Sequence, residues 1–288
     1  MSYIDYAAFD PVFWLHHAMV DRCFAMWQVL HPGNYVIPDP ATYNTFTSYA
    51  SQTQDVNSPL DPFYKDTFGN FWTSAEVYST ETFGYAYAET SNSSTTNVTS
   101  QVNTAINNLY GPKTWSSKLR FRASESSLTP STSIEWIANI RVKKYALNSP
   151  FFIHIFLGPF NPDPSSWPFE PSLVGTHFIF VKGASAIANS ACNCDPDQMV
   201  SGTIPLTYAL EELVSEGSLK SLDPEDVNQY LAQNLKYRVT LSDGTEISNE
   251  DVPSLKISVV SAEVQAPSSD AELPMWGEVE EQMDVSTG

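Results

Sequence analysis

Two adjacent histidines, His16 and His17, lie near the start of the chain in the stretch Asp-Pro-Val-Phe-Trp-Leu-His-His-Ala-Met-Val-Asp. On a helix, residues three and four positions apart share a face, so Phe13 and Asp21 lie one turn before and one turn after His17. A ring beside an imidazole and a carboxylate one turn away would orient a metal-binding histidine. Imidazole suits copper and zinc alike, so these residues predict a metal ligand without choosing the metal. The alternative is two structural histidines, one buried and one solvated.

A helix over residues 10–30 must carry these side chains. Asp10 is suited to the N-cap, because its carboxylate can accept a hydrogen bond from a free backbone N–H of the first turn. Pro11 suits the first helical position, since its missing N–H costs nothing there. The sequence His-Pro-Gly at 31–33 predicts the end of the helix. The following segment, 31–87, is rich in Pro, Tyr, Phe and Thr and is expected to form irregular coverings over a helical core.

The motif Asp-Pro-x-Phe-Trp-x-x-His-x-x-x-Asp resembles the second copper-binding motif of tyrosinases and related type-3 copper proteins, which include catechol oxidases and hemocyanins. The resemblance implies that His17 is the third histidine of the copper B site. Asp21 would then be the carboxylate behind it and Phe13 the ring beside it, with His16 a neighbour. Met19 departs from the family, which commonly carries Asn at this position. The departure affects the residues that support the histidine and does not remove the histidine as a ligand.

Further segments carry the same resemblance. Leu-Asp-Pro-Phe at 60–63, Phe-Trp-Thr-Ser at 71–74 and Phe-Gly-Tyr-Ala-Tyr at 83–87 resemble the segments that close the catalytic domain of fungal tyrosinases. The later part of the chain is similar to the C-terminal domain that shields the site in latent members. The likeness extends to about residue 265, and it implies a fungal tyrosinase.

The second half of the chain has the period of strands. Apolar and polar residues alternate over 134–142 and again over 237–241, which is typical of half-buried strands. Two short helices are expected at about 205–216 and 223–234. The fold class predicted is α+β, the end of an α-helical copper domain followed by a sandwich-like β-rich domain. The expected divisions are a copper-domain remnant at 1–90, a linker at 91–111, the β-rich shielding domain at 112–265 and a frayed acidic tail at 266–288.

The histidine count limits the chemistry. A type-3 centre holds two copper ions with three histidines each, and the chain has five histidines in all. His31 lies at a predicted helix end, and His154 and His177 lie on strand patterns, so these three are expected to be structural. By the resemblance, the other five ligands precede the motif. We therefore expect the C-terminal part of a tyrosinase, without oxidase activity by itself.

For the complete family enzyme, the resemblance implies copper-dependent conversion of monophenols to o-diphenols and of o-diphenols to o-quinones, with dioxygen, in melanin formation. Two alternatives stay open: a non-catalytic lid or copper-handling module, and a hemocyanin-like dioxygen carrier. The sequence does not separate tyrosinase from catechol oxidase, and it leaves the oligomeric state open.

For a lid, the resemblance implies that a bulky side chain of the C-terminal domain occupies the substrate pocket until a protease cuts the linker. The Ser/Thr-rich stretch 91–100 is where a protease could cut. The candidates are Phe160, Trp167 and Phe169 on the Pro-rich loop 158–171, or a residue on the turn after Phe180. Cys192 and Cys194 form a Cys-x-Cys pair, one residue shorter than the Cys-x-x-Cys thought to hand copper to the site in some relatives. Thiolates favour Cu(I), so copper handling by this pair is a second hypothesis.

Composition excludes other classes of protein. With 14 Lys and Arg against 33 Asp and Glu, the net charge is −19, which disfavours a nucleic-acid partner. No apolar run approaches the ~18 residues of a membrane span. No Lys or Arg precedes Arg22, so the first residues lack the basic region of a signal peptide, and a cytoplasmic location is expected.

Overall fold

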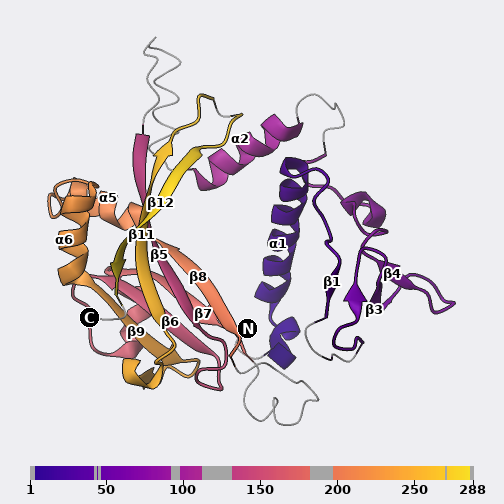
Figure 1. Cartoon of the computed structure of the whole chain (residues 1–288), viewed down its shortest axis with the longest axis horizontal. Helices are drawn as coiled ribbons and strands as arrows, with labels where there is room; N and C mark the ends of the chain where they lie inside the picture. Colours follow the sequence, from indigo (N-terminus) through magenta and orange to yellow (C-terminus); the bar gives the residue numbers. More distant parts are fainter. Residues whose placement is uncertain are drawn as a thin grey trace.

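The computed structural model describes residues 4–41, 44, 47–91, 98–111, 132–181, 197–269 and 271–285, which form a helical part and a β-rich part (Figure 1). The first part contains η1 (Ile4–Phe9), α1 (Pro11–Leu30), β1 (Asp39–Pro40), β2 (Thr53–Gln54), β3 (Pro59–Tyr64), β4 (Phe71–Thr73), η2 (Thr80–Phe83) and α2 (Val98–Tyr110). In Figure 1, α1 stands between the β-rich part and the segment that carries β1 to β4.

The β-rich part contains β5 (Thr132–Lys143), β6 (Phe151–Leu157), η3 (Pro164–Phe169), β7 (Leu173–Ile179), β8 (Met199–Pro205), α5 (Thr207–Ser215), α6 (Pro224–Asn234), β9 (Leu235–Leu241), β10 (Glu246–Ile247), η4 (Asn249–Asp251), β11 (Lys256–Gln265) and β12 (Met275–Asp284). Two antiparallel four-stranded sheets form here, ordered β10-β9-β6-β7 and β12-β11-β5-β8. The expected α+β class and sandwich-like second part are confirmed.

The sheets share one apolar core, built from the inward-facing residues of the alternating strands. Its largest fully buried members include Trp136, Phe151, Ile140, Ile153 and Ile257. On β5, the pattern of burial alternates from Trp136 to Val142, as the sequence predicts for a strand with one face toward the core. Burial of these large side chains is the main favourable contribution to the stability of this part.

The helix predicted over 10–30 is confirmed as α1. The Asp10 carboxylate accepts a hydrogen bond from the backbone N–H of Val12 at 2.9 Å, and Pro11 occupies the first helical position. After the helix, Gly33 has φ +90°, a left-handed conformation that only glycine adopts without cost. Within the described residues, no helix combines the length and apolar character needed to cross a bilayer.

Two boundary expectations are wrong. Residues 98–110 of the expected linker form α2, because Val98, Val102 and Ile106 recur every four residues and Val102 is fully buried. Residues 275–284 of the expected acidic tail form β12, which pairs antiparallel with β11 along its whole length. A strand at a sheet edge carries charge as protection against pairing with other chains, so a run of acids does not by itself indicate a frayed tail.

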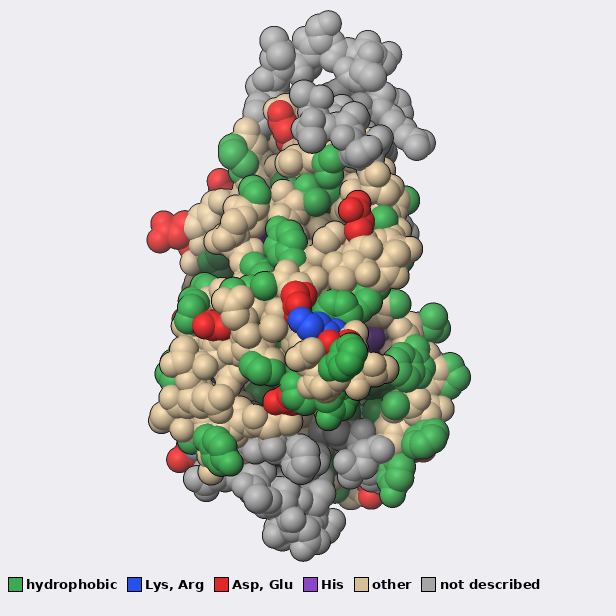
Figure 2. Space-filling view, turned by 90° about the vertical axis from the view of Figure 1, so that its right-hand side faces the viewer, with side chains coloured by type: hydrophobic (Ala, Val, Ile, Leu, Met, Phe, Trp, Pro, Cys, Tyr) green, Lys and Arg blue, Asp and Glu red, His purple; other side chains and the backbone are tan. Residues whose placement is uncertain are grey.

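The outer face of the helical part exposes aromatic side chains. Figure 2 views the molecule from the side of β3 and β4, and apolar side chains gather over the lower half of this face. Phe63, Tyr64 and Phe68, on and after β3, are among the exposed apolar residues. The Tyr64 ring stacks on Phe71 of β4 with centroids 4.5 Å apart, which ties the two short strands together.

Candidate metal-ligand site on helix α1

The imidazole of His17 is exposed on α1 and lies against an aromatic ring. The centroids of Phe13 and His17 are 4.2 Å apart, with the planes inclined by 44°. The His16 ring is 5.4 Å from that of His17 and perpendicular to it, so the two imidazoles point in different directions. The expected contact between Phe13 and His17 is therefore present, and His16 is a neighbour on the same helix.

Asp21 binds two tyrosines rather than His17. Its Oδ2 accepts hydrogen bonds from the hydroxyls of Tyr85 at 2.8 Å and Tyr87 at 2.5 Å. The Tyr87 hydroxyl also lies 3.2 Å from the backbone oxygen of Ala18, the residue after His17. Burial, followed by the hydrogen bond to Asp21, raises the pKa of Tyr85 to about 12 and raises the pKa of Tyr87 further. Both hydroxyls therefore stay protonated and donate to the carboxylate at neutral pH.

A second link joins the same segment to α1. The guanidinium of Arg22 pairs with the carboxylate of Glu89, and both side chains are largely shielded from solvent. The hydrogen bond from Arg22 lowers the pKa of Glu89, and its reciprocal effect raises the pKa of Arg22. Asp21 and Arg22 thus fasten the segment 85–89 to the helix one turn beyond His17.

Most of the apolar surface of α1 is uncovered. Leu15 is 71% exposed, and Trp14, Met19, Val20 and Phe24 are exposed too. Only Ala25 and Met26 are buried on this helix. Exposed apolar side chains in this number are typical of a surface that contacts another molecule.

The three candidate plug residues have different environments. Trp167 is buried, and its Nε1 donates a hydrogen bond to the backbone oxygen of Asn161 at 2.7 Å. Phe160 stacks on Phe156 with centroids 4.1 Å apart. Phe169 is 88% exposed. Of the three side chains, that of Phe169 is the most exposed.

The other predicted residues are dispersed. His154 and His177 lie on β6 and β7 within the sandwich, and His31 lies at the end of α1 against Trp27. Cys192 and Cys194 fall outside the described residues. Among the residues that the structure describes, no three His, Cys, Asp or Glu side chains are grouped as a metal site would require. The donors present therefore do not fit a complete two-copper centre.

The partners of Asp21 and Arg22 are not evident from the sequence. Tyr85 and Tyr87 follow Asp21 by more than sixty residues, and no spacing rule connects them. Glu89 is likewise one acid among 33. The sequence marks the Tyr-x-Tyr element only through its likeness to the end of a catalytic domain.

Comparison with known proteins shows that both parts of the chain resemble domains of tyrosinases. The family model described as the tyrosinase C-terminal domain matches residues 135–259, and the common central domain of tyrosinase matches residues 1–30. A tyrosinase of Neurospora crassa is 31% identical over 92% of this chain and 53% of its own length. A tyrosinase of Podospora anserina is 33% identical over 76% of this chain and 48% of its own length. The chain thus spans about half the length of these relatives.

A solved structure of recombinant mushroom tyrosinase has the same fold, with a TM-score of 0.71, 22% sequence identity and coverage of 98% of this chain and 51% of that one. Fold and family matches together define a protein in which the end of a tyrosinase central domain is joined to a tyrosinase C-terminal domain. The chain belongs to the tyrosinase family and corresponds to the C-terminal portion of its fungal members.

Proposed function

We propose that this chain supplies the last copper B ligand and the shielding domain of a tyrosinase-type oxidase. The reaction is the conversion of monophenols to o-diphenols and of o-diphenols to o-quinones with dioxygen. The observation that carries the proposal is the exposed imidazole of His17, packed against Phe13 on a helix that Asp21 fastens to Tyr85 and Tyr87. The match of residues 1–30 to the central domain of tyrosinase supports it.

The His17 side chain is of a type that binds copper, but the chain offers too few such side chains here for a complete centre. Imidazole nitrogen is a good copper ligand, and the bound ions would supply the redox chemistry. His17 would hold one ion, and Phe13 would restrict the rotation of its ring. Asp21 would act through the backbone, because its bonds to the tyrosines keep the turn after His17 in place. One histidine of six is too few, so the remaining donors must come from outside this chain.

A chimera tests the proposal. The preceding part of the Neurospora crassa relative's central domain is joined in front of this chain, and oxidation of an o-diphenol is measured after loading with copper. We expect quinone formation that His17→Ala abolishes and His16→Ala largely retains. Equal activity of the His17→Ala variant and the parent chimera would refute the assignment. Reversible dioxygen binding without quinone would favour a carrier instead.

A lid role for the β-rich part is a second candidate, favoured by the position of Phe169. Its ring projects from η3, whose shape is held by buried Trp167 and by the Asp163 carboxylate, which accepts a hydrogen bond from Ser165 N at 3.0 Å. A fixed loop that exposes a large ring is suited to fill a neighbouring apolar pocket.

In the active chimera, Phe169→Ala should increase o-diphenol oxidation before any proteolysis, because the pocket would be left open. Phe68→Ala is the matched control, since Phe68 is equally exposed but lies between β3 and β4, outside the β-rich part. An unchanged rate in the Phe169→Ala variant, or an equal gain in the control, would count against Phe169 as the plug.

A further inference from the structure

A cavity of about 480 Å³ lies in the β-rich part, between helix α5 and the start of β7. Its floor is apolar, because Leu157 is buried there and Leu173, Val174 and Leu213 are half-buried. None of its lining residues belongs to the helical part, and in Figure 1 α5 lies on the side of the β-rich part opposite α1. The cavity is therefore separate from the surroundings of His17.

The wall that α5 forms carries an aromatic ring and two carboxylates. Tyr208, Glu212 and Glu216 follow one another at intervals of four residues, so they lie in one row on the helix. All three line the cavity and are exposed. The Tyr208 hydroxyl is hydrogen-bonded to Glu212, which raises the pKa of Tyr208. The ring and the carboxylates thus form one polar rim beside the apolar floor.

The charge of this rim is not compensated within the described part of the chain. Neither Glu212 nor Glu216 forms an ion pair there. Both lie at the C-terminal end of α5, which has no basic residue in its last turn. The backbone carbonyls make this end of a helix negative, so carboxylates are unfavourable there and a cation is favourable. The rim therefore attracts positive charge.

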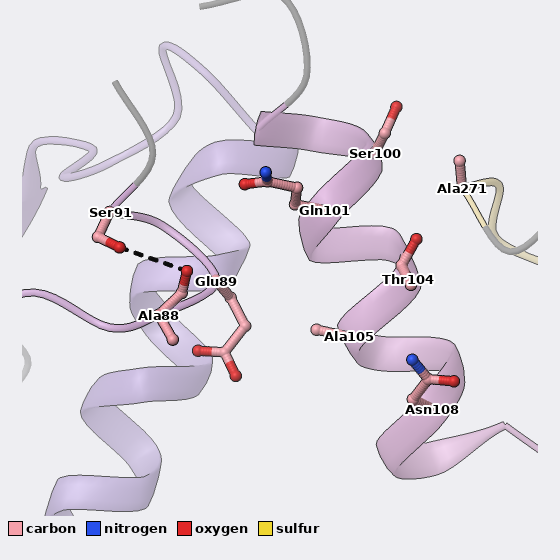
Figure 3. A pocket seen from close by; sticks show the side chains of 9 residues that line it. All are labelled: Ala88, Glu89, Ser91, Ser100, Gln101, Thr104, Ala105, Asn108 and Ala271. Atoms are coloured by element: carbon pink, nitrogen blue, oxygen red, sulfur yellow. Dashed lines mark hydrogen bonds between the residues drawn. The ribbon is translucent and has the colours of Figure 1, made fainter. Parts of the chain in front are cut away.

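A larger cavity beside α2, of about 650 Å³, differs in both respects. Figure 3 shows polar side chains on its wall, among them Ser100, Gln101 and Thr104, and no large apolar side chain. The carboxylate on its wall, that of Glu89, is already paired with Arg22. Only the cavity beside α5 thus combines an apolar floor with uncompensated charge, and this combination selects a ligand class.

We propose that the cavity beside α5 binds a small organic ammonium ion that carries an apolar body. The body rests on the floor, where its burial removes apolar surface from water. The ammonium group lies at the rim, attracted by the carboxylates of Glu212 and Glu216 and by the face of the Tyr208 ring. Binding at this site requires neither copper nor oxidase activity.

Phenethylamine is a suitable probe, because it has an apolar ring and an ammonium group but no phenol hydroxyl to oxidise. Isothermal titration calorimetry of the full chain should show saturable binding at millimolar concentrations or below. Phenethyl alcohol keeps the ring without the charge, and methylammonium keeps the charge without the ring, so each should bind about 10-fold more weakly or worse. No saturable binding of the amine, or equally tight binding of either control compound, would overturn the proposal.

Charge variants locate the site. Glu212→Gln with Glu216→Gln should raise the dissociation constant of phenethylamine by about 10-fold, as expected for the loss of two partly exposed ion pairs. Glu225→Gln with Glu250→Gln is the control, since it removes the same charge from exposed positions outside the cavity and should leave the dissociation constant unchanged. An equal loss of affinity in the control would show that net charge alone attracts the amine, and would refute the site.

A variant that fills the cavity gives an independent test. Ala209 is half-buried on the wall that α5 forms, so Ala209→Leu should weaken the binding of phenethylamine without a change in charge. Circular dichroism and the urea midpoint check that each variant folds. An unchanged dissociation constant in either Ala209→Leu or the Glu212→Gln, Glu216→Gln double variant would refute binding in this cavity.

Discussion

The ring of Phe13, on the same helix, lies against His17 as expected. Asp21 supports His17 indirectly, because it binds two tyrosines rather than the imidazole. The carboxylate reaches Tyr85 and Tyr87, and through them it fixes the backbone of α1 rather than the imidazole. A charged acceptor with two phenol donors forms stronger hydrogen bonds than neutral pairs do. The position of His17, the proposed ligand, therefore depends on a segment that lies far away in the sequence.

His154 is buried, and its lowered pKa predicts that stability depends on pH. Its ring nitrogens lie 3.1 Å from Thr176 Oγ1 and 3.0 Å from Thr240 Oγ1, and burial lowers its pKa to about 4. The unfolded chain, with an ordinary pKa near 6.5, binds a proton at a higher pH than the folded chain does. The free energy of unfolding should therefore fall by about 3 kcal/mol as the pH drops from above 6.5 to about 4.

Urea unfolding at a series of pH values measures this dependence. The difference between the parent and His154→Gln isolates the contribution of His154, since other titrating groups are common to both chains. His31→Gln, at the exposed end of α1, is the control and should keep the parent's slope. If His154→Gln keeps that slope too, the protonation of His154 is not the cause.

At the level of elements, β7 and β8 approach each other closely because glycines face larger side chains. A Cβ atom added at Gly202 would collide with the His177 ring, and one added at Gly175 would lie 2.7 Å from Ile204 Cγ2. The imidazole of His177 therefore covers the backbone of β8, and burial lowers its pKa. These contacts join one edge of each sheet.

Gly202→Ala should lower the free energy of unfolding by about 1–3 kcal/mol, the usual cost of overpacking. The measurement is the urea midpoint, with Ser201→Ala as the control on the exposed neighbouring position. Adding His177→Ala to Gly202→Ala should recover part of the loss, because the clash is removed. Additive losses in the double variant would show that the two residues do not interact.

For the molecule as a whole, the exposed apolar side chains of α1 and the small number of histidines both suggest that further protein segments complete this site. Leu15 and Val20 are among the apolar side chains that α1 exposes, and they lie in the segment that matches the central domain of tyrosinase. The relatives are about twice as long as this chain. We therefore expect the rest of a tyrosinase central domain to supply both the remaining copper ligands and the cover for α1.

The chain alone should therefore bind copper weakly and produce no quinone. One imidazole leaves most coordination positions unfilled, and affinity depends on a complete donor set. Copper titration followed by an o-diphenol oxidation assay is the measurement, and the active chimera is the positive control. Quinone formation by the chain alone, above that of free copper, would contradict the prediction.

The sequence by itself determined α1, its cap and the strands of the sandwich, and it singled out His17 as the candidate ligand, because helix and strand periods and the motif around His17 are local patterns. Tertiary structure alone decided the tyrosine partners of Asp21, the folding of α2 from a segment that looks like a linker and the pairing of β12. Each of these depends on contacts between residues distant in the chain, such as Asn103 with Ala271. Local composition does not encode such contacts, since a helix or strand end gains its stability from what it packs against.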